Sequence, residues 1–448
     1  MENLREVART IFDKALADCS VENAVARHVS VREGTLYVGE EAIDLRAIHR
    51  VRIVAAGKAS STTLFSLLRQ LAFPAGFDLG GVLIAPEASH RFQSNLPDGF
   101  QYFAGGHPSP NQASFAGARA GLAMLRNLPR DSPEETLCFF LISGGASAMM
   151  ELPLDPTISL ADTADFHRAL VASGASITEM NCVRKHFSAV KGGRLALAAG
   201  NAICRSLLIS DVPIGREDAL GSGPTLPDTS TVTECREILE RFVLLPRFPA
   251  AVRHFFESSA LTETPKPAEF HAQATVLLNA QSLAESAARY AQALGLTPII
   301  DNTCDEWEYK AAAHYLLDRL RTLRNRQSNL CLISTGELSV GLPAESGSHG
   351  AIGVGGRNQQ FALYAATLLT SEDAPIAILS AGSDGIDGNS PAAGAVLDRG
   401  ILPRGDIGTA CQVLKSFNAY PFLLDRNAAI VIGPSGNNLR DLRILLTR

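Results

Sequence analysis

Small, flexible and charged residues follow several apolar runs of this chain, where binding chemistry is expected in an α/β protein. The runs 51–56, 136–143, 205–210 and 375–381 have the length and composition of buried strands. In open α/β sheets, ligands bind outside the carboxyl ends of the strands. The residues that close or follow these runs include Gly57-Lys58, Ser143-Gly144-Gly145-Ala146-Ser147, Asp211 and Gly382-Ser383-Asp384.

Lys58 is expected between the end of a strand and the first turn of a helix, where the helix dipole disfavours a cation. An anionic ligand would compensate for that cost. The alternative is a lysine whose side chain simply extends into water. The segment 143–147 suits an anion, because glycines let backbone N–H groups approach a phosphate or carboxylate closely. Its competing interpretation is a tight turn that needs glycine for a positive φ.

Residues 180–200 concentrate positive charge in a chain whose formal net charge is −6. Their basic residues are Arg184, Lys185, His186, Lys191 and Arg194. If the segment is helical, Arg184 and Lys191 lie on the same face. Arg184 is then a candidate for binding an acidic substrate. A solvated helix face is the alternative interpretation, because charge runs of this kind commonly contact only water.

Arg357 is a second cation expected at the start of a helix, directly after Gly355 and Gly356. A guanidinium group in that place suits a phosphoryl oxygen, which it can bind bidentately. The alternative is a surface arginine that follows a flexible loop. His107, in the loop 105–114, is interpreted as a substrate-side residue, although a structural histidine fits equally well.

Three aspartates near the expected strand ends are candidates for holding Mg²⁺. Asp211, Asp384 and Asp387 offer carboxylate oxygens, and Mg²⁺ takes one or two carboxylates together with waters and substrate phosphates. Helix capping or turn formation is the alternative for them. The eight cysteines include no C-x-x-C pair and no clustered Cys/His pattern, so we expect reduced thiols in a cytosolic protein.

Several familiar motifs are absent: the P-loop, the G-x-G-x-x-G dinucleotide motif, the kinase H-R-D loop, the G-x-S-x-G elbow and H-E-x-x-H. The net charge argues against nucleic acid or an anionic membrane as a general partner. The first 20 residues form an amphipathic charged pattern rather than a secretory leader. No apolar run approaches the roughly 20 residues of a membrane span. We expect a soluble, cytoplasmic protein that binds small molecules.

Continuous apolar runs, as opposed to alternating ones, indicate strands buried on both faces of a mainly parallel sheet. Such runs occupy 51–57, 81–86, 136–143, 205–210, 274–279, 329–334 and 375–382. Helical spacing of apolar residues is found at 60–72, 112–128, 282–295 and 307–325. The alternation predicts a doubly wound α/β fold, and the loss of apolar rhythm near 260–272 predicts a linker.

Nine segments, read in order, make the chain similar to the glycerate 2-kinase family, whose C-terminal part is called the MOFRL domain. They are VAAGKAS, GGHPSPNQAS, LISGGASAMMELP, VRKHFSAVKGGRLA, LLISDVP with GSGPTLPDTST, STGELSV, GGRNQQFALYAA, SAGSDGIDGNSPAAGAVLD and GPSGNNLRDL. The resemblance spans nearly the whole chain. It implies a Rossmann-like N-terminal domain over residues 1–265, a smaller α/β MOFRL-type domain over residues 272–448, and an active site in a cleft between them.

The resemblance implies phosphorylation of the 2-hydroxyl of D-glycerate, with ATP and Mg²⁺ as cofactors. It assigns catalysis to Lys58 and Arg357, and removal of either is expected to lower kcat by several orders of magnitude while leaving folding intact. We expect the substrate to be bound by Ser143, Gly144, Gly145, Ser147, Arg184 and His107. Nucleotide contacts are expected from Asp211, Gly336, Glu337, Gly355, Gly356, Ser383 and Asp384, with Mg²⁺ on Asp211 and Asp384.

Three stretches depart from the family pattern. Ala146 stands where the family has glycine, Pro391 stands where it has an acidic residue, and the tail reads IGPSGNN where the family has TGPTGTN. These departures leave open a kinase of another small hydroxy or sugar acid, or a non-catalytic nucleotide-binding relative. An oxidoreductase is disfavoured because the dinucleotide motif is missing. A homodimer is also left open.

Overall fold

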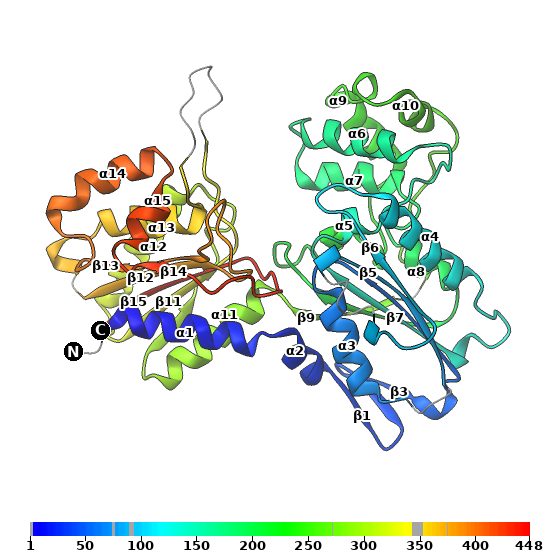
Figure 1. The fold of residues 1–448 in the computed structure, drawn as a ribbon, viewed down its shortest axis with the longest axis horizontal. Helices are drawn as coiled ribbons and strands as arrows, with labels where there is room; N and C mark the ends of the chain where they lie inside the picture. Colours follow the sequence, from blue (N-terminus) through cyan, green and yellow to red (C-terminus); the bar gives the residue numbers. More distant parts are fainter. Residues whose placement is uncertain (1–2, 74–76, 89–93, 271, 343–352, 374) are drawn as a thin grey trace. The chain divides into compact units, whose positions relative to one another are not determined.

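The structure, a computed structural model, describes residues 3–73, 77–88, 94–270, 272–342, 353–373 and 375–448. The chain forms two compact units (Figure 1). Residues 21–277 make the N-terminal unit, and residues 1–20 together with 278–448 make the C-terminal unit. The N-terminal helix α1 (Leu4–Asp18) therefore packs with residues beyond 277, whereas the sequence had placed it in the domain 1–265.

The N-terminal unit is built on a six-stranded sheet in the order β6-β5-β4-β7-β8-β9. The pairs β6/β5, β5/β4, β4/β7 and β7/β8 are all parallel. Every residue of β7 is buried, as its uninterrupted apolar sequence predicts. The strands are β4 (Arg50–Ala56), β5 (Asp78–Ala85), β6 (Phe100–Ala104), β7 (Thr136–Ser143), β8 (Ile203–Ile209) and β9 (Ala272–Leu278).

The strand order reverses direction between β4 and β7. From β4 the chain adds β5 and β6 on one side of the sheet, and then returns to add β7 and β8 on the other. Right-handed crossovers put the helices of these two halves on opposite faces. The crevice outside the carboxyl ends of β4 and β7 is the ligand-binding place of such sheets. The predicted doubly wound, mainly parallel sheet is confirmed.

Helices cover the sheet of the N-terminal unit. Figure 1 shows α3 (Ser60–Leu71) and α4 (Gln112–Arg126) on its two sides. Side chains of α4 share one apolar core with alternate residues of β4, β5 and β7, including Val54, Val82 and Phe140. Helix α2 (Val21–His28) and a small antiparallel sheet precede β4. The strands of that sheet are β1 (Val29–Arg32), β2 (Thr35–Val38) and β3 (Glu41–Asp44).

A helical cluster is inserted around β8 and has a core of its own. Five phenylalanines dominate that core, and they are Phe166, Phe187, Phe248, Phe255 and Phe256. Figure 1 shows α6, α7, α9 and α10 gathered together in green. The helices of this cluster are α6 (Leu160–Val171), α7 (Ile177–Phe187), α9 (Val232–Arg241) and α10 (Ala250–Glu257). The short helices α5 (Ala146–Met149) and α8 (Arg194–Ala198) belong to the core of the sheet.

The C-terminal unit contains a second six-stranded sheet, in the order β10-β11-β15-β12-β13-β14. Only β10 and β11 pair in parallel, because β15 lies antiparallel between β11 and β12, and β13 and β14 continue antiparallel. The strands are β10 (Thr297–Ile300), β11 (Leu330–Thr335), β12 (Ile376–Gly382), β13 (Gly394–Asp398), β14 (Ala429–Ile430) and β15 (Asp441–Thr447).

Figure 1 shows α1 and α11 below this second sheet and the other helices of the unit above it. The core on the upper side joins α12 and α13 to β11, β12 and β15. No helix in the described ranges is both long and apolar enough to cross a membrane. The remaining helices are α11 (Ala280–Ala293), α12 (Tyr309–Arg324), α13 (Arg357–Thr367), α14 (Ile407–Lys415) and α15 (Ala419–Leu424).

Candidate functional site

The turns that follow β4 and β7 are joined by backbone contacts. The N–H of Lys58 donates to the carbonyl of Gly144 at 2.9 Å, and the N–H of Ala59 donates to Oγ of Ser143 at 3.0 Å. Gly57 has φ of +118°, and a Cβ there would lie 2.4 Å from Oγ of Ser143. Glycine is therefore required at position 57. Ser143 is buried and holds the two turns together, which is a different role from the predicted substrate contact.

The side chain of Lys58 is exposed at the carboxyl end of β4, two residues before α3 begins. A Cβ on Gly145 would lie 3.3 Å from Cγ of Lys58 and 3.1 Å from Cδ2 of His107, so these side chains border Gly145. Burial lowers the pKa of His107, and the charge of Lys58 lowers it further. In the described part of the chain, the Lys58 ammonium makes no ion pair.

A cavity of about 700 Å³ opens beside these turns within the N-terminal unit. Five of the predicted residues line it, and they are His107, Gly145, Ser147, Arg184 and Asp211. The structure thus collects residues from four places in the sequence around one hollow at the reversal point of the sheet. Gly144 packs directly against the Asp211 carboxylate. A Cβ on Gly144 would lie 2.0 Å from Oδ2 of that aspartate.

Arg184 contributes a poorly satisfied guanidinium group to the cavity. Its Nη1 lies 3.5 Å from Oδ1 of Asn181, which is a long hydrogen bond, and its Nε is buried with no hydrogen-bond partner in the described residues. Burial lowers the pKa of Arg184, while the negative charge of Glu151 opposes that change. A carboxylate in the cavity would satisfy the unpaired donors.

Three residues that the sequence did not single out as a group form a buried ionic cluster behind this cavity. Glu151 accepts hydrogen bonds from Nζ of Lys191 and from Nε2 of His167, the latter at 3.0 Å. The side chains of Glu151 and Lys191 are at most 1% exposed. Burial opposes ionisation of Glu151, but Lys191 and His167 lower its pKa to about 2. His167 also lines the cavity.

The predicted helix face shared by Arg184 and Lys191 does not exist. Helix α7 ends at Phe187, so Lys191 lies in the following turn. The solvated alternative is also wrong for most of the segment, because Lys185, His186 and Lys191 are buried. Lys185 instead pairs with Asp228 at 3.1 Å.

Replacement of Glu151 by glutamine is expected to destabilise the N-terminal unit at pH 7, because it leaves the Lys191 charge buried without a counterion. The cost should be about 3–5 kcal/mol, which lowers Tm by roughly 10 °C. Thermal unfolding followed by circular dichroism checks this. The exposed Glu240→Gln serves as the control and should change little.

The same pair predicts the direction of acid sensitivity. The pKa of Glu151 falls from an ordinary 4.5 to about 2 on folding, so its stabilisation is complete above about pH 4.5. It is lost as the pH falls from there toward 2. The wild-type Tm should therefore drop over this window more steeply than that of Glu151→Gln, and parallel curves would contradict the assignment.

The other candidate metal ligands have different surroundings. Oδ1 of Asp384 accepts the N–H of Ile386 at 3.1 Å, which is turn chemistry. Asp387 is buried, and its two oxygens accept the N–H groups of Asn358 and Gln359 at 3.0 and 2.9 Å. Asp387 therefore caps the N-terminus of α13, so the capping alternative fits it and magnesium binding does not.

Arg357 is the first residue of α13, as predicted, but carboxylates of the C-terminal unit compensate its charge. Its Nε and Nη2 donate to the two oxygens of Asp441 at 2.6 and 3.1 Å. Its Nη1 donates to Glu337 at 3.0 Å. Burial acts against the charge of Arg357, yet Asp441 and Glu337 raise its pKa above the usual range. The Arg357 side chain as a whole remains 35% exposed.

The predicted nucleotide residues of the C-terminal unit lie in tightly packed loops, and Glu337 among them pairs with Arg357. A Cβ on Gly336 or Gly356 would lie 2.3 Å from Asp305 or Asp387, respectively, so no larger residue fits. The remaining contacts are Gly355 N–H to Asn389 at 2.9 Å and Leu439 N–H to Oγ of Ser383 at 2.6 Å. The structure brings these residues together, but it leaves their role toward a nucleotide as a prediction.

Comparisons with known proteins match both units. A model described as a domain of unknown function, DUF4147, matches residues 7–257, and the MOFRL family model matches residues 330–441. D-glycerate 2-kinase of Thermotoga maritima is 30% identical over 99% of this chain and 98% of its own length. The chain belongs to the glycerate 2-kinase family. The resemblance seen in the sequence is thereby confirmed.

Solved structures agree with this glycerate 2-kinase assignment. The crystal structure of glycerate kinase from Thermotoga maritima has a TM-score of 0.82 and 29% identity, with 99% of each chain covered. Glycerate 2-kinase of Pyrococcus horikoshii is 29% identical over 99% of this chain and 97% of its own. A relative from Agrobacterium vitis, 31% identical over 99% of this chain and 94% of its own, is named only provisionally, as a hydroxypyruvate reductase.

Proposed function

We propose that this glycerate 2-kinase family member transfers the γ-phosphoryl group of ATP to the 2-hydroxyl of D-glycerate, giving 2-phosphoglycerate and ADP. One observation carries the proposal. One cavity at the reversal point of the doubly wound sheet has two cationic side chains at it. Arg184 lines the cavity and has a buried nitrogen without a hydrogen-bond partner in the described residues, and the exposed Lys58 borders Gly145 of its lining. The names of the relatives from Thermotoga maritima and Pyrococcus horikoshii support the reaction type.

The chain's residues fit the groups that such a reaction needs. Asp211 lines the cavity and supplies one carboxylate, which is enough for Mg²⁺ when waters and phosphate oxygens complete its coordination. The cation at Lys58 suits the triphosphate. ATP supplies the phosphoryl group when bound, and Mg²⁺ neutralises part of its charge. Asp384 remains a weaker magnesium candidate, because its carboxylate is engaged in a turn.

Positioning and charge stabilisation supply most of the rate in phosphoryl transfer. Lys58 would hold a phosphoryl oxygen, and Arg184 would hold the carboxylate of the acceptor. His167 would take the proton of the acceptor hydroxyl. Its Nε2 is held by Glu151, and its Nδ1 makes no hydrogen bond to any described residue. Burial lowers the pKa of His167, which keeps the imidazole neutral and able to accept a proton near pH 7.

Replacement of Arg184 by glutamine is expected to raise KM for D-glycerate about 100-fold, with a smaller change in kcat. The reason is the loss of a charge-assisted, bidentate hydrogen bond to the carboxylate. Initial rates at varied glycerate and saturating ATP measure both constants. Arg168→Gln, which also lines the cavity but pairs with Asp165 on an exposed surface, is the matched control. Equal effects in the two variants would show that Arg184 has no special contact.

The substrate class is tested by measuring ADP release with D-glycerate, L-glycerate and longer aldonic acids. Turnover should be highest with D-glycerate. A faster reaction with an aldonic acid would assign another hydroxy acid as the acceptor. ATP binding without turnover would identify a non-catalytic relative. Oxidation of NADH or NADPH by hydroxypyruvate would support the reductase name of the Agrobacterium vitis relative.

We also propose a cytoplasmic location. All eight cysteines are free thiols, and seven of them are buried. Structural disulfides are common in oxidising compartments and rare in the cytosol, so this usage supports a reducing environment. The homodimer stays a prediction, which sedimentation of the purified protein would check.

A further inference from the structure

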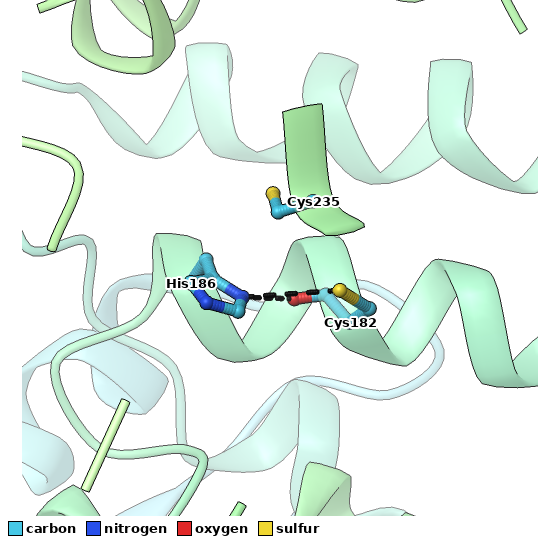
Figure 2. A group of neighbouring side chains, drawn as sticks. All are labelled: Cys182, His186 and Cys235. Carbon is cyan, nitrogen blue, oxygen red and sulfur yellow. Dashed lines mark hydrogen bonds between the residues drawn. The ribbon is translucent and has the colours of Figure 1, made fainter. Parts of the chain in front are cut away.

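Helices α7 and α9 bring two thiols and an imidazole together outside the cavity described above. Figure 2 shows Cys182 and His186 on α7, with Cys235 facing them from α9. One imidazole nitrogen and both sulfur atoms lie within 4.8 Å of one another. It is the one such grouping of metal-binding side chains in the described ranges. No local sequence pattern predicts this group, because Cys235 comes 53 residues after Cys182.

We propose that Cys182, His186 and Cys235 bind a thiophilic metal ion, with Zn²⁺ as the cation that these donors suit best. Two thiolates and one imidazole are a ligand set that Zn²⁺ accepts in tetrahedral sites. Cys182 and His186 are spaced i and i+4, which places both donors on one face of α7. The third donor comes from the neighbouring helix, so the ion would link α7 to α9.

His186 is buried, and its hydrogen bonding is incomplete. The imidazole is completely buried. Its Nδ1 lies 2.9 Å from the carbonyl of Cys182 and 3.9 Å from the Cys182 sulfur, while its Nε2 is buried with no partner in the described residues. An orphaned buried nitrogen is costly, and such groups commonly mark a missing ligand or ion.

The space beside the thiols also suits metal binding. Cys182 also lines a separate cavity of about 370 Å³. That cavity provides an entry path and room for a water as the fourth ligand.

Titration of the intact, reduced protein with Co²⁺ tests the site without any variant. A 1:1 complex with cobalt–thiolate charge-transfer and intense tetrahedral d–d absorption is expected, and one equivalent of Zn²⁺ should displace it. Absence of both absorptions would overturn the proposal. Formation of a disulfide between Cys182 and Cys235 in protein treated with excess zinc would also overturn the proposal.

Alanine substitutions of the cysteines then test whether the metal ion binds at this site. Cys182→Ala and Cys235→Ala should each weaken Zn²⁺ binding at least about 100-fold, because even changes behind the ligands cost 10- to 100-fold. Cys411→Ala, which removes the one exposed thiol, should leave affinity unchanged. Circular dichroism confirms that the variants are folded. Equal zinc affinity in all three variants would show that the metal binds elsewhere.

Discussion

Lys58→Met is expected to reduce kcat about 1,000-fold and to leave Tm almost unchanged. A cation aimed at the charge of a transferring phosphoryl group contributes mainly in the transition state, and loss of one such contact commonly costs this much. The fold should tolerate the change, because the Lys58 side chain is exposed and makes no ion pair in the described ranges. Methionine keeps the length of the apolar part of the side chain.

The matched control for Lys58 is Lys310→Met. Lys310 is also exposed, but it lies on α12 of the C-terminal unit and is not among the residues that line the described cavity. Its replacement should change kcat less than twofold. Single-turnover and steady-state rates with ATP and D-glycerate measure both variants. A Lys58→Met enzyme with normal turnover would remove this lysine from the mechanism.

Arg357→Met is expected to lower kcat about 1,000- to 100,000-fold, which is the range seen when an arginine that stabilises a phosphoryl group is removed. Unlike Lys58, Arg357 is also expected to contribute to the stability of the fold. Asp441 is 1% exposed and loses its bidentate partner, so the free energy of unfolding should fall by about 2–3 kcal/mol. The expectation that folding is unaffected, made from the sequence, therefore does not follow from these contacts.

A double variant separates the two roles of Arg357. Adding Asp441→Asn to Arg357→Met removes the uncompensated carboxylate charge and should recover part of the lost Tm. It should recover no activity if the guanidinium acts on the phosphoryl group. Recovery of both Tm and kcat would assign Arg357 a structural role only.

The sequence predicted the sheet of the N-terminal unit well because its strands are continuous and apolar. The predicted run 136–143 coincides with β7, and Lys58 lies at the strand end where it was expected. Strand β15 was missed in the C-terminal unit. It begins with Asp441 and contains Arg443, and its burial comes from its place between β11 and β12. Such a place depends on tertiary structure rather than on local pattern.

The same limit explains which site residues were missed. Glu151, His167 and Lys191 come from a loop, a helix and a turn, so only the fold reveals that one carboxylate accepts hydrogen bonds from both the imidazole and the ammonium group. Asp441 is 84 residues from Arg357. In contrast, the sequence predicted five of the cavity residues, because four of them follow strands as small or charged residues and Arg184 stands out in a basic segment.

Phosphorus NMR of the reaction with ATP, Mg²⁺ and D-glycerate tests the central claim most directly. Transfer to the 2-hydroxyl predicts a new phosphomonoester signal, split into a doublet by the single proton on C2, that grows as the γ-phosphate signal of ATP disappears. A triplet from a phosphate on the C3 methylene, or an ATP spectrum that never changes, would contradict the proposed reaction.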